Sequence, residues 1–359
     1  MSPKIIEKAM ARIWRAKLTQ PFRTAKGQHE LLENVLFTVE LSHKTRGYGE
    51  AAVATHITGE TVRETLEHLK AVAREICGRD LAAFRAVAGE MKERFPQNPC
   101  ARAAVEMALL DALTREKRMP LWRFFGSKPR TLRSDMTVVL GEVADAAAMT
   151  RAILRRGIRS FKIKIGRNFD EDLRRVTVVA ALAPRRPIYL DANQGFTAGQ
   201  TLKFLKELKT LKIRPALIEQ PIPKGDWEGL KQVARQSDVP VCADESASSL
   251  ADVKRLIREK AADVINIKFM KTGIFEAWEI AKLAQRHGIK LMIGTMMETA
   301  LATTAAAHFA AGLRGFDFID LDAPLFIDQK ITRGFHPSIR GVYDLRGIKA
   351  GIGVAPLLS

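Results

Sequence analysis

Short apolar segments recur at a regular interval over the last two thirds of the chain. Eight such segments begin roughly 22–28 residues apart, at 136–140, 161–165, 188–190, 216–218, 239–242, 264–267, 291–293 and 318–321. Their length and composition are typical of buried β-strands. The stretches between them carry apolar residues at helical spacing, most clearly at 172–182, 201–211, 250–257 and 275–287. The pattern therefore predicts strands that alternate with helices.

Eight strands and their helices within about 190 residues are the signature of a (β/α)8 barrel, an α/β fold. An open doubly wound sheet is the alternative, but no GxGxxG motif follows the first strand of any unit. We therefore predict a modified TIM barrel.

The first 130 residues follow a different pattern and predict a separate α+β domain. Two extended segments come first, at 5–18 and 34–41, and two segments of helical composition follow, at 61–76 and 101–115. The glycine-rich end of the chain continues no barrel pattern, so we expect it to return to the first domain. The predicted division is a capping domain at 1–128, a catalytic barrel at 129–330 and a C-terminal tail at 331–359.

Composition narrows the functional class only slightly. Lys and Arg number 58 against 40 Asp and Glu, a net charge of +18, but the basic residues are spread along the chain and aromatics are only 7%. A basic nucleic-acid-binding scaffold is therefore the weaker alternative to an enzyme. No apolar run reaches the ~18–20 residues that cross a bilayer, and the first residues lack a signal-peptide segment. Three scattered cysteines without CxxC spacing favour a reducing cytoplasm.

Three acidic residues end consecutive predicted strands: Asp191, Glu219 and Asp244. Active-site groups of such barrels lie at the carboxyl ends of the strands. Neighbouring parallel strands lie less than ~5 Å apart, so three carboxylates there would repel one another without a cation between them. Oxygen ligands with room for water and substrate suit Mg²⁺. The alternative is that each acid caps the helix that follows.

Three lysines end the neighbouring strands. Lys162 and Lys164 are two residues apart and share one face of their strand, which we expect to point into the barrel. A nearby divalent cation and a like charge disfavour protonation, which lowers a lysine pKa toward neutrality and makes it a general base. Lys268 ends a strand four positions further round, so it approaches from the opposite side; its alternative role is an ion pair with a neighbouring acid.

A metal between two opposed lysines predicts proton transfer at a carbon next to a carboxylate. The metal would bind the substrate carboxylate and stabilise the enediolate that forms when the α-proton leaves. One lysine removes the proton and the other returns one from the opposite face, which is epimerisation. With a leaving group on the substrate, the same site would perform β-elimination.

The segments KIKIG, LDANQGF, IEQP, ADES and INIK, in this order, resemble the enolase superfamily in its muconate-lactonizing-enzyme-like branch. The segment 101–126 looks like the helical approach to its barrels. The resemblance implies the three strand-end acids as Mg²⁺ ligands, Lys164 and Lys268 as acid/base groups, and Lys162 as electrostatic helper.

The end of the last strand, Asp320-Leu321-Asp322, is similar to that of dipeptide epimerases such as the L-Ala-D/L-Glu epimerases, whose acids hold the substrate's α-ammonium group. The alternative is a strand-end acid and a cap. The resemblance also implies that loops near 20–30 and 50–60 select the side chain, with Lys26 able to bind a carboxylate. We further place Thr137, Asn193 and Met297 among the substrate-binding residues.

These observations predict Mg²⁺-dependent epimerisation of a dipeptide at the α-carbon of its C-terminal residue, through two-lysine 1,1-proton transfer. The alternatives within the branch are o-succinylbenzoate synthase, N-succinylamino acid racemase and muconate cycloisomerase, whose substrates lack a free ammonium group beside the reacting carbon. The preferred dipeptide stays open. We expect a cytoplasmic homo-oligomer with no nucleic-acid or membrane partner.

Overall fold

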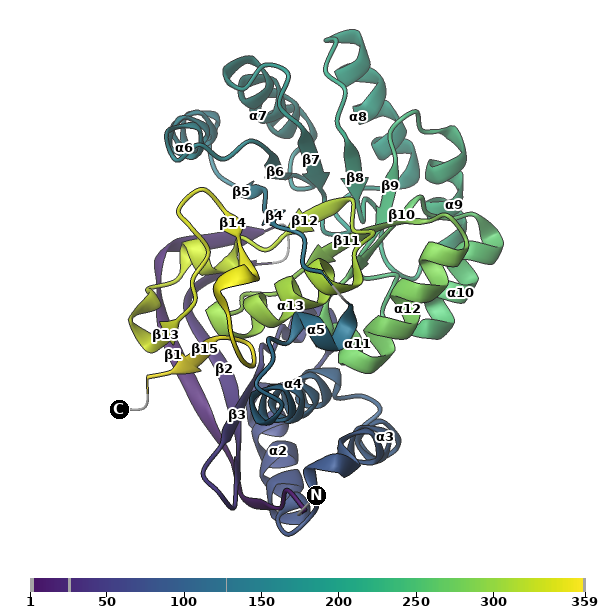
Figure 1. Ribbon diagram of the computed structural model, residues 1–359. Helices are drawn as coiled ribbons and strands as arrows, with labels where there is room; N and C mark the ends of the chain where they lie inside the picture. The colour runs from purple at the N-terminus through teal and green to yellow at the C-terminus, as the bar shows by residue number, and fades with distance from the viewer. Residues whose placement is uncertain (1–2, 25–26, 127, 358–359) are drawn as a thin grey trace.

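The computed structural model describes residues 3–24, 27–126 and 128–357 (Figure 1). Its largest sheet contains eight strands in chain order, each beside the next. They are β5 (Met136–Val138), β6 (Phe161–Lys164), β7 (Ile188–Asp191), β8 (Leu217–Glu219), β9 (Val241–Ala243), β10 (Val264–Ile267), β11 (Lys290–Gly294) and β12 (Phe318–Asp320). All these pairings are parallel, and every predicted apolar segment overlaps a strand. The predicted barrel architecture is confirmed.

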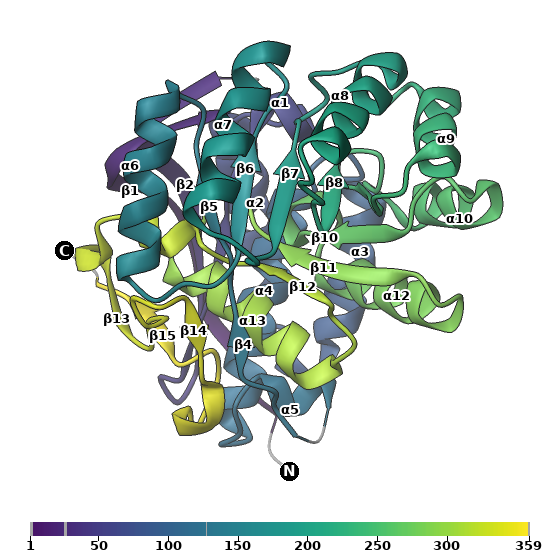
Figure 2. The same ribbon diagram turned by 90° about the horizontal axis from the view of Figure 1, so that it is seen from above.

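Helices surround the strands (Figure 2). They are α6 (Val143–Arg155), α7 (Phe169–Leu182), α8 (Ala198–Thr210), α9 (Trp227–Gln236), α10 (Leu250–Glu259), α11 (Phe269–Thr272), α12 (Ile274–Arg286) and α13 (Ala300–Leu313). The last strand departs from this pattern because only a 3-10 helix, η2 (Ala323–Phe326), follows it, with a proline in its first turn.

Contacts between the first and last strands close the barrel. The Asp135 N–H donates to the Ile319 carbonyl at 3.0 Å, and the Leu321 N–H donates to Ser134 Oγ at 2.8 Å. The Thr137 N–H donates to Asp322 Oδ2 at 2.6 Å. Asp322 therefore joins the two strands as well as facing the barrel mouth.

The first domain is an antiparallel sheet packed on helices. Its strands are β1 (Ile6–Thr24), β2 (Gly27–Leu41) and β3 (Arg46–Ala51), in that order across the sheet. Its helices are α1 (Thr55–Thr58), α2 (Val62–Ile76), η1 (Leu81–Ala83), α3 (Phe84–Arg94), α4 (Pro99–Glu116) and α5 (Trp122–Phe125). The predicted extended and helical segments lie within these elements, apart from one residue at the start of 5–18 and of 61–76, whereas β3 and α3 were not predicted.

The glycines of β3 explain why its sequence lacks a strand signal. Glycine has a low propensity for β-strands. Here, however, α4 packs so closely against β3 that there is no room for a side chain at these positions. A Cβ on Gly49 would lie 1.9 Å from the Ala104 carbonyl oxygen, and one on Gly47 would lie 2.1 Å from that of Ala108. Close approach of the helix backbone therefore requires glycine at both positions.

Helix α13 joins the two domains. All its residues from Ala300 to Gly312 are buried, so it is covered on every side. Glu50 on β3 accepts hydrogen bonds from the N–H and hydroxyl of Thr299 at 3.0 and 2.6 Å, and from the Ala302 N–H at 3.3 Å. A carboxylate of the first domain thus caps a barrel helix and ties the domains together.

The C-terminal segment lies beside the first domain in both views (Figures 1 and 2). Its elements are η3 (Gln329–Ile331), β13 (Thr332–Gly334), β14 (Val342–Tyr343), η4 (Leu345–Gly347) and β15 (Val354–Pro356), with β14 pairing to β4 (Leu132–Arg133). The Ile352 N–H donates to Asp111 Oδ1 of α4 at 2.8 Å, and the Leu121 N–H donates to the Gly351 carbonyl at 2.8 Å.

Candidate active site

A cavity of about 270 Å³ lies at the carboxyl ends of the strands, between the two domains. Eight of the residues singled out in the sequence line it: Thr137, Lys162, Lys164, Asn193, Lys268, Met297, Asp320 and Asp322. The remaining wall comes partly from β2 and from the segment around α1. The structure therefore brings these predicted residues to one place.

Lys162 lies at the centre of the buried charges. Its ammonium group is 2.9 Å from Asp191 Oδ2, 2.8 Å from Glu219 Oε2 and 2.7 Å from Asp320 Oδ2. The side chain is 2% exposed. Three carboxylates from three different strands thus share one ammonium.

Lys164 points to the same face of β6, as the alternation of a strand requires. Its Nζ donates to Asp191 Oδ2 at 2.7 Å and to Asn193 Oδ1 at 3.0 Å. Asn193 has a φ of 41°, in the left-handed region, and its N–H donates to Asp191 Oδ1 at 3.0 Å. This turn directs the asparagine amide back toward the lysine.

The predicted metal ligands end three adjacent strands and are fully buried. Asp191 and Glu219 are direct partners in the β7–β8 register, and Asp244 follows β9. Burial would raise the pKa of Asp191, but the ammonium groups of Lys162 and Lys164 hold it well below the usual range. Burial and the Asp191 charge raise the pKa of Glu219 to about 8.

This arrangement fits a divalent cation. The three side chains offer only carboxylate oxygens, the donors that Mg²⁺ prefers. Glu219 Oε1 accepts from Asn266 Nδ2 at 2.8 Å, whereas Glu219 Oε2 is buried without a hydrogen bond and meets only the Lys162 charge. A positive ion would compensate this oxygen.

Lys268 approaches from the other side of the barrel, since β10 lies four strands from β6 among eight. Its Nζ donates to Asp244 Oδ2 at 2.7 Å. Lys271, on α11, was not identified from the sequence. Its Nζ donates to Asp244 Oδ1 and to the Asn266 carbonyl at 2.8 and 2.9 Å, so it holds this carboxylate in place.

The carboxylates of the site oppose the expected fall of the lysine pKa values toward neutrality. Burial lowers the pKa of Lys162, but Asp191 and Asp320 outweigh burial and raise it well above the usual range. The pKa of Lys268 is also raised, since the charges of Asp244 and Glu219 outweigh burial. The expected fall therefore depends on a divalent cation, which would offset the carboxylate charges.

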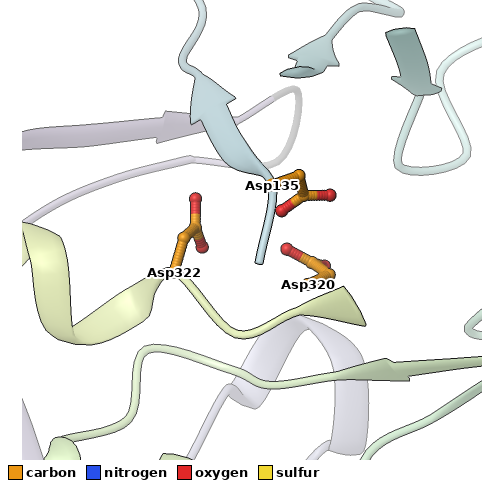
Figure 3. A group of neighbouring side chains, drawn as sticks. All are labelled: Asp135, Asp320 and Asp322. Atoms are coloured by element: carbon orange, nitrogen blue, oxygen red, sulfur yellow. The ribbon is translucent and has the colours of Figure 1, made fainter. Parts of the chain in front are cut away.

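Asp320 and Asp322 lie together at the end of the last strand, and a third acid joins them (Figure 3). One carboxylate oxygen from each of Asp135, Asp320 and Asp322 lies within 4.8 Å of the other two. Burial and the neighbouring Asp320 raise the pKa of Asp322 to about 6. Among the described residues, no other group of three or more His, Cys, Asp or Glu side chains has its ligand atoms this close together. Asp135 precedes β5 and carries no motif, so the sequence did not reveal it.

The first domain supplies a mostly apolar wall to the cavity. This wall contains Leu31, Leu32, Val53, Ala54, Ile57 and Val62, and Met296 and Met297 face it from the barrel. Asn34 Nδ2 donates to the Met297 carbonyl at 3.0 Å and to Glu50 Oε1 at 2.7 Å, which fixes β2 against the barrel. Lys26 lies outside the described residues.

No helix within residues 3–24, 27–126 and 128–357 has the length and apolar character needed to span a membrane.

Comparison with known proteins gives two family matches that together cover most of the chain. Residues 8–126 match "Mandelate racemase / muconate lactonizing enzyme, N-terminal domain", and residues 144–357 match "Enolase C-terminal domain-like". The chain is 45% identical to a hydrophobic dipeptide epimerase of Citrifermentans bemidjiense, over 99% of this chain and 98% of that protein. It is 42% identical to an aromatic dipeptide epimerase of Herpetosiphon aurantiacus, over 98% and 99%.

A solved structure shares this fold and holds ligands. The dipeptide epimerase of Enterococcus faecalis, in complex with Mg and the dipeptide L-Leu-L-Tyr, aligns with a TM-score of 0.93 at 31% identity. The alignment covers 98% of this chain and 99% of that one.

Proposed function

Because the chain belongs to the mandelate racemase/muconate lactonizing enzyme family of the enolase superfamily, and is an isomerase of the epimerase and racemase class, we propose that it epimerises dipeptides in a Mg²⁺-dependent reaction. The reacting centre is the α-carbon of the C-terminal residue. The observation that carries this proposal is the position of Lys164 and Lys268 on opposite sides of one cavity, with Asp320 and Asp322 in its wall.

The lysines divide the proton transfer between the two faces of the substrate carbon. Lys164 Nζ removes the α-proton from one stereoisomer, and Lys268 Nζ delivers a proton from the opposite face. For the other stereoisomer the roles are exchanged. Asn193 and Asp191 orient Lys164, and Asp244 orients Lys268, through the hydrogen bonds described above.

The predicted ligands Asp191, Glu219 and Asp244 would hold Mg²⁺ at the strand ends. When bound, Mg²⁺ offsets their charge and the negative charge that develops on the substrate carboxylate as the α-proton leaves. Lys162, between three carboxylates, adds a further fixed positive charge on the same side. Lys271 keeps Asp244 in position.

Asp320 and Asp322 favour a dipeptide over the substrates of the alternative enzymes, because the Lys162 ammonium that contacts Asp320 is shared with two other carboxylates and leaves the buried pair short of positive charge. The apolar wall from the first domain supports a dipeptide with apolar side chains. The polar residues that the first domain adds to this lining are Glu33, Asn34 and His56. The hydrophobic and aromatic dipeptide epimerases among the relatives agree with this preference.

We also propose the domain limits 1–128, 129–330 and 331–359, which the contacts of the tail with α4 support. The cytoplasmic location and the homo-oligomeric state stay predictions from the sequence.

Proton NMR of apolar dipeptide isomers in D₂O tests the reaction and its two lysines. The unmodified enzyme should interconvert the isomers and exchange the α-proton of the C-terminal residue for deuterium. Lys164→Ala and Lys268→Ala should each stop interconversion and keep, at most, exchange of opposite isomers. Lys290→Ala, an exposed lysine at the start of β11, serves as control and should act normally. Near-normal interconversion by either active-site variant contradicts the mechanism.

A further inference from the structure

Asp135 lies beneath the barrel mouth and has no assigned role. It is 0% exposed, and neither of its carboxylate oxygens has a hydrogen-bond partner. Figure 3 shows its carboxyl group directed toward Asp320, with Asp322 beside them. Burial and the charges of Asp320 and Asp322 raise the pKa of Asp135 well above its usual range, so a cation beside it would be needed to keep it ionised.

The other two acids of this cluster already have partners. Asp320 Oδ2 is held by Lys162 at 2.7 Å, and Asp322 Oδ2 accepts from the Thr137 N–H at 2.6 Å. Both side chains line the cavity, as does Thr137, which follows Asp135 by two residues and shares its face of the chain. The cluster thus offers acceptors on three sides and adjoins the substrate cavity.

The acids of this cluster outnumber the positively charged groups beside them. Lys162 is the ammonium that contacts this cluster in the described part of the chain, and it is shared with Asp191 and Glu219. The shared ammonium therefore leaves the three acids with excess negative charge, which a second cation would offset. A primary ammonium carries one charge and three N–H donors, which matches three carboxylates.

The separation of the acids also fits an ammonium. Three oxygens that accept from one tetrahedral nitrogen at about 2.8 Å stand about 4.6 Å apart. One oxygen each of Asp135, Asp320 and Asp322 lies within 4.8 Å of the other two, which admits this spacing.

We propose that Asp135 completes, with Asp320 and Asp322, a three-carboxylate site that receives the α-ammonium group of the substrate and selects a free amino terminus. This inference rests on the proposed function, because it assumes that the substrate is a dipeptide. It adds a third specificity-determining residue, which precedes β5, whereas Asp320 and Asp322 lie at the end of the adjacent β12.

The test compares a dipeptide with its des-amino analogue, in which hydrogen replaces the amino group. In Asp135→Asn, which keeps the shape of the side chain, the KM for the dipeptide should rise about 10- to 100-fold through loss of a charge-assisted hydrogen bond. The competitive inhibition constant of the des-amino analogue should stay within about twofold of that of the unmodified enzyme, because the analogue presents no ammonium.

Glu106→Gln is the matched control, since Glu106 is a buried acid outside the site that accepts from the Phe275 N–H of α12. It should leave the ratio of the two constants unchanged. If Asp135→Asn fails to fold, Asp135→Ser provides the same comparison. Equal changes of both constants would show a purely structural role and overturn the assignment.

Titration with Mn²⁺ tests the alternative that the three acids bind a metal ion. The number of ions bound per chain should be the same in the unmodified enzyme and in Asp135→Asn. Loss of one equivalent would assign the cluster to a metal and overturn the proposal. An unmodified enzyme that neither binds nor epimerises dipeptides would instead contradict the proposed function itself.

Discussion

The protonation state of His308 should set part of the pH dependence of stability. Its imidazole is fully buried on α13, where Nδ1 accepts from the Trp122 N–H at 3.0 Å and Nε2 lies 3.0 Å from the Ile352 carbonyl. A protonated Nδ1 could not accept, so only the neutral ring satisfies both contacts. Burial lowers the pKa of His308 to about 4.

The direction of the effect follows from linkage. An unfolded histidine titrates near pH 6.5, so between about pH 6.5 and pH 4 the unfolded chain binds the extra proton. The contribution of His308 is therefore fully present above about pH 6.5 and is lost as the pH falls toward 4. Between pH 7.5 and pH 4.5 the loss amounts to about 2–3 kcal/mol.

Urea unfolding at the two pH values measures this loss. His308→Gln keeps polar groups at the site but does not titrate, so the free energy of unfolding of the unmodified protein should fall by about 2–3 kcal/mol more than that of the variant. The variant is needed because other buried groups also titrate in this range. Burial raises the pKa values of Glu60 and Glu106 to about 7, so their contributions to the free energy of unfolding are lost as the pH rises, opposite to that of His308. Equal pH dependence of the two proteins, within about 0.5 kcal/mol, would refute the reasoning.

Three further results are expected. Exhaustive EDTA treatment should abolish α-proton exchange and Mg²⁺ should restore it, because Asp191, Glu219 and Asp244 share a cation; full activity after chelation contradicts the metal assignment. Acetylating the amino group of a good dipeptide should weaken transition-state binding by about 2–5 kcal/mol, measured as kcat/KM; better turnover of N-acylated amino acids would indicate an N-succinylamino acid racemase. Glu50→Ala should lower the free energy of unfolding by about 3 kcal/mol, because the N–H groups of α13 lose their acceptor; Glu50→Gln should retain more of it in urea denaturation.

The repeating pattern was sufficient to locate the barrel strands, because each of them is buried and therefore apolar. The same regularity predicted that the side chains at the strand ends meet. In the structure, Asp191 is the register partner of both Lys164 and Glu219. These positions depend on local sequence and on the repeat of the fold alone.

The features that the sequence did not reveal depend on residues far apart in the chain. Strand β3 forms because Gly47 and Gly49 admit α4, and no property of the strand itself indicates that neighbour. Lys271 follows its strand by one helical turn, where lysine is usually a solvated surface residue. Its contact with Asp244 exists only once α11 folds back over the strand end.

The sequence by itself thus determined the barrel, the family and the residue types at the strand ends. Only the tertiary structure decided which oxygens share which ammonium, and that Asp135 joins Asp320 and Asp322 across the seam of the barrel. The physical reason is that charge interactions depend on distance in space. Residues that are separated by more than 180 positions in the chain, such as Thr137 and Asp322, become hydrogen-bonded neighbours when the barrel closes.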